Sequence, residues 1–195
     1  MRSLNQKNDV GILTGGQSKR MGQNKALLPF GGNTIIEFLI QNLSHPETEI
    51  LLSANTTEYD FLGRPVIPDN FPDCGPIAGI EALLNTTKQD YMSIISCDTP
   101  FFNFCILELM LNEFDGRPLV LKSPDYIIFP TLGIYPKTFQ SILHNHIIHE
   151  KYSIYRILQQ MDVKYYVPEI SAEDTEKLFL NMNFPAEYTK ALNYL

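Results

Sequence analysis

The sequence predicts an α/β fold in which a mostly parallel sheet is covered by helices on both faces. Short apolar runs typical of buried strands alternate with segments of helical periodicity, and this order favours parallel strands joined by helical crossovers. Glycine, asparagine or aspartate lies at or after the ends of several runs. A length of 195 residues suits a single domain, 1–195, with a substantial core.

The N-terminal half is predicted to hold three strands and two helices. Residues 9–14 form a buried strand that leads into a glycine loop, and residues 33–43 form a helix. Thr34 opens that helix and Glu37 follows three residues later, which is the spacing of a capping box. The other elements are a strand at 49–54, a helix at 76–85 that begins at a proline, and a strand at 91–96.

The C-terminal half continues the alternation. Its predicted elements are a helix at 103–113, strands near 117–122 and 127–135, two helices, a strand at 162–168 and a closing helix from Pro185. The second of the two adjacent helices has Ser153 as N-cap, followed by apolar residues at helical spacing. The whole pattern is that of a Rossmann-like, three-layer fold. In such folds, ligands bind beyond the carboxyl ends of the strands.

Composition and charge exclude several classes of protein. The net charge of −7 argues against general binding to nucleic acid or to anionic membranes. The first residues lack the apolar core of a signal peptide, and no apolar run approaches the roughly 20 residues that span a bilayer. Cys74, Cys97 and Cys105 are odd in number and form no CxxC pair, which indicates reduced thiols. We therefore expect a cytoplasmic protein.

The stretch LTGGQSKRMGQNK concentrates cations around two glycines in an acidic chain. Glycines let backbone N–H groups approach phosphate oxygens, and nearby cations neutralise the charge, although a plain turn would also use glycines. Neither GxxxxGK[ST] nor GxGxxG is present. The pattern L-x-G-G-x3-R-M-G-x2-K resembles the signature loop of the nucleotidyltransferases. That resemblance implies that Arg20 and Lys25 are catalytic, in contact with the triphosphate and the reacting phosphate. It also implies nucleotide binding by Leu13, Thr14, Gly15, Gly16 and Lys25.

Asp98 follows an apolar strand in the stretch Cys97-Asp98-Thr99-Pro100. Taken alone, such an aspartate is a turn residue or a helix cap. Beside a triphosphate loop, a carboxylate suits Mg²⁺, which takes one or two carboxylates together with phosphate oxygens. The stretch resembles the C-D-x-P metal site of the same enzymes, which implies that Asp98 is catalytic, binds Mg²⁺ and lies against the nucleotide.

A second nucleotide-binding segment runs from Asp69 to Gly79. On its residues alone it is a loop that ends in a helix begun by proline. The segment resembles the D-x(n)-G-P-[LI]-A-G signature of guanylyltransferases, which implies that Asp69 contacts the guanosine and that Gly75 and Pro76 lie beside the nucleotide. Asn55, which follows the second strand, stands where that family carries a nucleotide-contacting asparagine; it is equally a turn residue.

Two further stretches are assigned to the acceptor. Asn181 and Asn183, within FLNMNFP, resemble the family's F-x-N-[IV]-N-T-P, and Pro130-Thr131 resembles its H-P-T-x-G-x-Y. Phe184 stands where the family has a threonine that caps the next helix, so we expect Asn183 to serve as a substitute cap.

From residue 10 to residue 188, these stretches together resemble the molybdenum cofactor guanylyltransferases. The resemblance implies Mg²⁺-dependent transfer of GMP from GTP to molybdopterin-bound molybdenum cofactor, with release of pyrophosphate. The implied protein partners are those that deliver the cofactor and the apo-molybdoenzymes that receive it. The protein itself is expected to be a monomer or a weak homo-oligomer. Two alternatives stay open: a cytidylyl- or sugar-phosphate nucleotidyltransferase, and a non-catalytic homologue that binds the nucleotide or cofactor. A Rossmann dehydrogenase is disfavoured by the missing glycine fingerprint.

Overall fold

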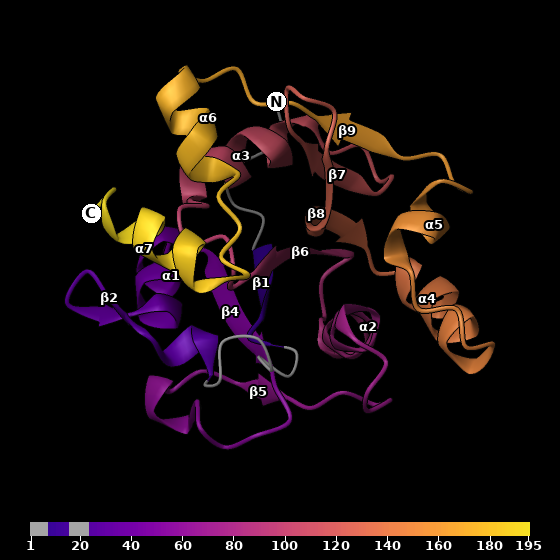
Figure 1. The fold of residues 1–195 in the computed structure, drawn as a ribbon. Helices are drawn as coiled ribbons and strands as arrows, with labels where there is room; N and C mark the ends of the chain where they lie inside the picture. Colours follow the sequence, from indigo (N-terminus) through magenta and orange to yellow (C-terminus); the bar gives the residue numbers. More distant parts are fainter. Residues whose placement is uncertain (1–7, 16–23) are drawn as a thin grey trace.

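The computed structural model describes residues 8–15 and 24–195 (Figure 1). Within them, the main sheet has seven strands in the order β5-β4-β1-β6-β8-β7-β9. These strands are β1 (Asn8–Leu13), β4 (Thr48–Ser53), β5 (Val66–Ile67), β6 (Tyr91–Ser96), β7 (Leu119–Lys122), β8 (Ile128–Pro136) and β9 (Lys164–Tyr166).

Strand β8 is the one antiparallel member of the described sheet. It pairs antiparallel with β6 and with β7, whereas every other pair of neighbours is parallel. The predicted fold class, a mostly parallel sheet between helices, is confirmed. Because β8 runs antiparallel to β6, Leu132 in the middle of β8 pairs with Ile95 near the end of β6, and the first residues of β8 lie at and beyond that end. We call this side of the sheet, where β1, β4 and β6 end and β8 begins, the carboxyl edge.

Helices cover both faces of the sheet, as Figure 1 shows. They are α1 (Ile35–Leu43), α2 (Pro76–Thr86), α3 (Phe104–Glu113), α4 (Phe139–Ile148), α5 (Ile154–Leu158), α6 (Ala172–Leu178) and α7 (Pro185–Leu192). Buried side chains of α1, α3 and α6 share one core with Val10 and Ile12 of β1, and those of α2, α4 and α5 share another with Leu13. This split follows from the two-residue period of a strand, which sends neighbouring side chains to opposite faces.

The predicted elements are all present, and the capping box at α1 forms as expected. The Thr34 hydroxyl accepts from the Glu37 N–H, and the Glu37 carboxylate accepts from the Thr34 N–H at 2.8 Å. Six of the described elements were not predicted. Five of them are too short for periodicity to reveal: β2 (Pro29–Phe30), β3 (Asn33–Thr34), β5 and the 3-10 helices η1 (Lys25–Leu27) and η2 (Asp60–Leu62). The sixth, α6, buries only Leu178 and so has no apolar face in its sequence.

The start of α7 corrects one expectation. Asn183 does not cap the helix with its side chain. Instead, the Glu187 carboxylate of the first turn reaches back and accepts from the N–H groups of Asn183 and Phe184, at 2.6 and 2.7 Å. In a capping box the N3 carboxylate accepts from the backbone at the helix start, and an N-cap hydroxyl accepts from the N3 N–H. Here Glu187 supplies the carboxylate, and no threonine is present to supply the hydroxyl.

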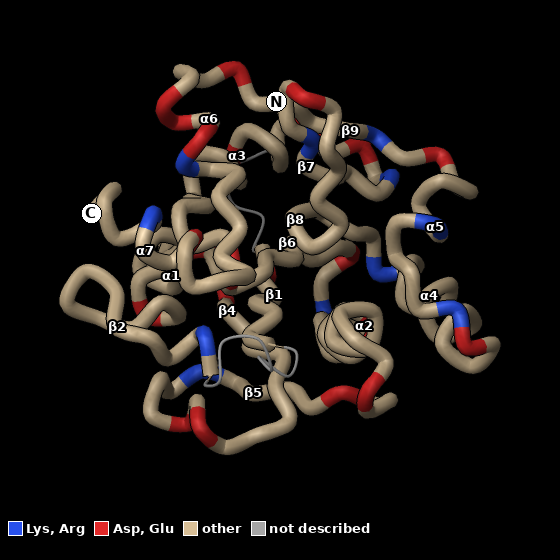
Figure 2. The backbone as a smooth tube through the Cα atoms, viewed as in Figure 1, with Lys and Arg blue, Asp and Glu red and all other residues tan. Residues whose placement is uncertain are grey.

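Charges of both signs are interspersed around the outline of the described chain in the view of Figure 2. None of the helices that the structure describes combines the length and the apolar character needed to cross a membrane.

Candidate functional site

The end of β1 is held firmly at the carboxyl edge. The Thr14 N–H and hydroxyl both donate to the carbonyl of Ser53, and the Thr14 carbonyl accepts from the Cys97 thiol at 3.2 Å. The side chains of Leu13 and Thr14 are buried, whereas Gly15 is exposed, with open space where a side chain would stand. The chain therefore leaves the sheet at Gly15. The predicted residues Gly16 and Arg20 lie outside the described part of the chain.

Lys25 and Asp98, far apart in sequence, meet at this edge. The Lys25 Nζ lies 3.6 Å from the Asp98 Oδ2, and their side chains are 13% and 19% exposed. Lys25 is the first residue of η1, and Asn24 is the N-cap of that helix. The lysine is therefore largely enclosed and lies opposite a carboxylate.

Asp98 also contacts the C-terminal segment that carries Asn181 and Asn183. The Met182 N–H donates to the Asp98 carbonyl at 2.8 Å. Among the described residues, the Asp98 Oδ1 and the Asn181 Oδ1 are both buried without a hydrogen-bond partner. Unpartnered buried oxygens are costly, and carboxylate and amide oxygens are the donors that Mg²⁺ prefers.

Asp98 and Asn181 offer Mg²⁺ two oxygen donors, one of which is a carboxylate. No group of three or more His, Cys, Asp or Glu side chains in residues 8–15 and 24–195 forms a complete metal cage. A magnesium site that relies on one carboxylate and on phosphate oxygens needs no such cage. The donors present therefore fit a Mg²⁺ that arrives with a nucleotide.

Cys97 lies between Thr14 and Asp98 but is a poor nucleophile. Its side chain is buried, and burial together with the neighbouring Asp98 charge raises the pKa of the thiol to about 12. At neutral pH the thiol is therefore protonated, and it donates to the Thr14 carbonyl. Cys97 thus packs and links the ends of β1 and β6.

Asn55 and Asp69 are paired with one another. The Asn55 Nδ2 donates to the Asp69 Oδ2 at 2.9 Å, and the Asn55 Oδ1 accepts from the Asp69 N–H at 2.8 Å. The Ser53 hydroxyl donates to the other carboxylate oxygen of Asp69 at 3.3 Å. The ends of β4 and β5 therefore present one acid-amide unit at the carboxyl edge, in which Asn55 is exposed and Asp69 is half-buried.

The Gly75-Pro76 turn and Gly79 bring α2 close to this unit. Gly75 has a φ of +75° and precedes Pro76, the first residue of the helix. A side chain at Gly79 would meet the Ser53 hydroxyl and lie 3.0 Å from the Leu13 Cδ2. Glycine is therefore required at Gly79 for the helix to approach β1 and β4, as close backbone packing often demands.

On the acceptor side, Pro130 and Thr131 sit in a bulge of β8. Val120 of β7 pairs with Gly133, but the next residue, Leu121, pairs with Phe129. Proline cannot donate to a strand ladder, so a bulge accommodates it. The buried Tyr135 donates its hydroxyl to the Pro130 carbonyl at 2.5 Å and fixes the bulge.

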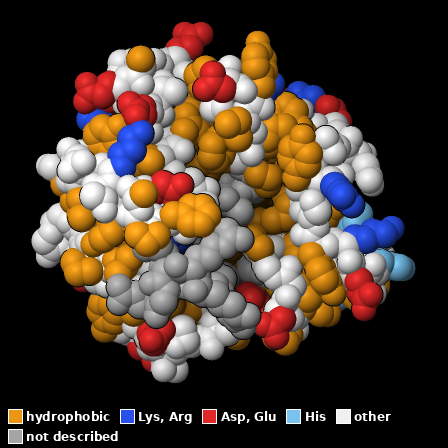
Figure 3. Space-filling model, in the orientation of Figure 1, with side chains coloured by type: hydrophobic (Ala, Val, Ile, Leu, Met, Phe, Trp, Pro, Cys, Tyr) orange, Lys and Arg blue, Asp and Glu red, His pale blue; other side chains and the backbone are white. Residues whose placement is uncertain are grey.

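Aromatic contacts join this bulge to the C-terminal segment. The Phe129 and Phe179 ring centroids are 5.0 Å apart. This contact brings the segment that carries Pro130 next to the segment that carries Asn181. Farther along, the Lys122 Nζ lies 4.6 Å from the ring centroid of the exposed Tyr126 and 5.6 Å from that of Tyr165. In Figure 3, hydrophobic side chains gather over this part of the molecule and line a hollow.

Several residues that organise the site carried no motif. Ser53 donates to Asp69, and Tyr59 donates to Thr14 and to Asn24, the residue before Lys25. Glu81 of α2 is buried, accepts from Asn70 at 2.9 Å and from Gln140 of α4 at 2.6 Å, and so braces the loop after Asp69. Such contacts depend on tertiary packing, so spacing along the chain gives no signal for them.

Comparison with known proteins identifies the family. The MobA-like NTP transferase domain matches residues 10–164. The chain belongs to this family. It is 40% identical over 185 residues to the probable molybdenum cofactor guanylyltransferase of Carboxydothermus hydrogenoformans, covering 94% of each chain. It is 30% identical over 188 residues to a protein of the same name from Clostridium perfringens, covering 93% of this chain and 94% of the other.

Solved structures show the same fold. The molybdopterin-guanine dinucleotide biosynthesis protein A of Archaeoglobus fulgidus matches with a TM-score of 0.80 at 23% identity, covering 95% of this chain and 97% of that one. A cytidylyltransferase from Leptospira borgpetersenii matches with a TM-score of 0.67 at 18% identity, covering 98% of this chain and 87% of that one. Both lie below 25% identity, so they support the architecture alone.

Proposed function

We propose that this protein transfers GMP from GTP to molybdopterin-bound molybdenum cofactor, with release of pyrophosphate. The observation that carries the proposal is the meeting of Lys25 and Asp98 at 3.6 Å, where β1 and β6 end. The family membership and the names of the full-length relatives support guanylyl transfer to the molybdenum cofactor.

The reaction we propose is an in-line displacement. A terminal phosphate oxygen of the acceptor forms a bond to the α-phosphorus of GTP, and the bond from that phosphorus to the pyrophosphate oxygen breaks. The acceptor is already an anion, so no side chain has to remove a proton. Lys25 contributes a fixed positive charge where negative charge develops, and the rate depends on positioning and charge neutralisation.

Asp98 would hold Mg²⁺, with Asn181 as a neighbouring oxygen donor. When bound, the ion would supply charge neutralisation at the α-phosphate and the departing pyrophosphate. This chain's own contribution is the pair of buried, unpartnered oxygens, which are already in place beside the Met182–Asp98 hydrogen bond.

Asp69 and Asn55 would recognise the guanosine beside the Gly75-Pro76 turn. A carboxylate accepts from the adjacent N–H groups of guanine, which cytosine and uracil do not offer in that arrangement. The acceptor would lie over Pro130 and Thr131, between Asn181, Asn183 and the aromatic side chains near the start of β8, which suit a planar pterin. We also propose that the protein is cytoplasmic and is a monomer or a weak homo-oligomer. Its proposed protein partners are those that deliver the cofactor and the apo-molybdoenzymes that receive it.

The test is pyrophosphate release from GTP, CTP and UTP with Mg²⁺ and the pterin acceptor. Turnover with GTP well above that with the other two supports the proposal, whereas preference for CTP favours the cytidylyl alternative. Binding of GTP without any turnover would indicate the non-catalytic homologue.

Asp98→Asn tests the metal site, with calorimetry of GTP binding as a second readout. We expect the variant to lose most of the increase in GTP affinity that Mg²⁺ gives the wild type. An unchanged magnesium response would contradict the assignment of Asp98.

A further inference from the structure

The side chain of Asn24, immediately before Lys25, is held at both of its polar atoms. Its Oδ1 accepts from the Ala26 N–H at 3.2 Å, which caps η1, and from the Tyr59 hydroxyl at 3.1 Å. Its Nδ2 donates to the Glu58 carboxylate at 3.0 Å. Capping by Asn24 determines where η1 begins, and Lys25 is the first residue of that helix.

Tyr59 reaches Asn24 from the segment that joins β4 to β5. That segment also carries Asn55, and Asp69 follows it after β5. The Tyr59 ring is 2% exposed and packs in the core with Val10 and Ile12 of β1 and Ile50 and Leu52 of β4. Packing of the ring in the core therefore fixes the position of the hydroxyl.

The Tyr59 hydroxyl also lies 3.4 Å from the Thr14 carbonyl. The same oxygen thus contacts Thr14, which directly precedes Gly15, and Asn24, which directly precedes Lys25. It has one hydrogen to donate, shared between the Thr14 carbonyl and the closer Asn24 Oδ1. Burial raises the pKa of this phenol, so it remains a donor over the neutral range.

We propose that Tyr59 is a positioning residue for Lys25. Through Asn24 its hydroxyl fixes the start of η1, and this places the lysine ammonium opposite Asp98. The same contact couples the segment beside Asn55 and Asp69 to the charge at the reacting phosphate. This inference rests on the proposed function, because its effect is measured on nucleotidyl transfer.

Tyr59→Phe removes the hydroxyl and leaves the packed ring. We expect kcat for pyrophosphate release to fall on the order of tenfold, the size of one hydrogen bond, with KM for GTP within about twofold. Tyr91→Phe is the matched control, because it removes a phenol hydroxyl at the first residue of β6, at the opposite edge of the sheet. Its kcat should equal that of the wild type. Asn24→Ala, a second route to the same disruption, should lower kcat at least as far as Tyr59→Phe.

A double-mutant cycle with Lys25→Met separates positioning from general stability. If Tyr59 acts through Lys25, Tyr59→Phe has no further effect on kcat once the lysine is gone. Equal losses in both backgrounds, or an unchanged kcat for Tyr59→Phe, would overturn the inference while leaving the wild-type activity and the proposed function intact. An absence of turnover in the wild type would instead refute the proposed function.

Discussion

Replacing Lys25 with methionine removes one charge while keeping the length and most of the volume of the side chain. In the folded protein the ammonium lies 3.6 Å from the Asp98 carboxylate, which corresponds to a raw attraction of about 4–5 kcal/mol at an effective dielectric constant of about 20. Desolvation of the two groups offsets much of this. We expect a loss of about 1–3 kcal/mol in unfolding free energy, because both side chains keep some solvent exposure.

The loss of turnover should be much larger than that. A fixed charge directed at the transition state contributes about 2.7–4 kcal/mol, so kcat should fall roughly 10²–10³-fold. A stability loss of this size lowers Tm by several degrees in a chain of this length. At 25 °C nearly all molecules stay folded, and instability cannot account for the loss of rate.

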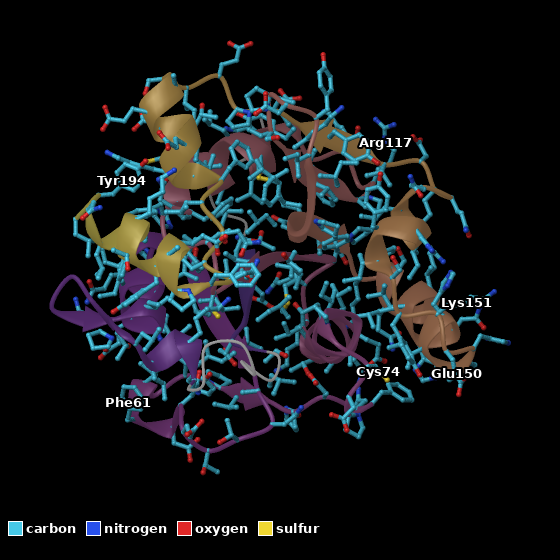
Figure 4. All side chains as sticks on the ribbon, in the orientation of Figure 1. Phe61, Cys74, Arg117, Glu150, Lys151 and Tyr194 are labelled. Carbon is cyan, nitrogen blue, oxygen red and sulfur yellow. The ribbon has the colours of Figure 1, made fainter. Side chains whose placement is uncertain are left out.

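The assay pairs pyrophosphate release at saturating GTP and Mg²⁺ with denaturant unfolding of the same preparations. Arg117→Met is the matched control, since it also removes a cation held by carboxylates, with Asp115 at 2.7 Å and Asp162 at 3.0 Å. Arg117 precedes β7 at the opposite edge of the sheet and lies at the periphery in Figure 4. It should keep full turnover. Turnover losses that match the folded fractions, or an equal loss in Arg117→Met, would refute the reasoning.

Three further predictions concern packing, recognition and pH. Gly79→Ala should destabilise the fold by about 1–3 kcal/mol and weaken GTP binding, because the added methyl displaces the Ser53 hydroxyl that donates to Asp69; calorimetry and unfolding check both, and unchanged binding would contradict it. Asn55→Ala should lower the preference for GTP over CTP, measured as the ratio of their kcat/KM values, because Asp69 loses the amide that fixes it; an unaltered ratio would count against this role. The pKa of Cys97 is raised by burial from its ordinary value of 9.0 to about 12, so its stabilisation is present below pH 9 and is lost as pH rises toward 12; Cys97→Ala should flatten the decline in unfolding free energy that begins near pH 9, and a decline identical to that of the wild type would exclude the thiol as its source.

The segments that carry their own local rules could be predicted from sequence. The start of α1 could be predicted because a capping box is confined to four residues. The buried strands could be predicted because both faces of each are covered, which gives a continuous apolar run in the sequence. By contrast, β5 and η1 are two and three residues long, too short for any periodicity, so no signal in the sequence indicates either. The cap of α7 was also misjudged, because Glu187 replaces the missing threonine partner.

The sequence alone determined which polar and charged residues could form the site and which predicted strand ends they follow. The order of strands and helices indicated the fold class, and the motifs indicated the family. Tertiary structure alone decided that Lys25 faces Asp98, that Asn55 and Asp69 form one unit, and that Tyr59 touches both flanks of the glycine loop. The physical reason is that these contacts join residues distant in the chain. Their geometry depends on how strands align and helices pack, and spacing along the sequence does not record either.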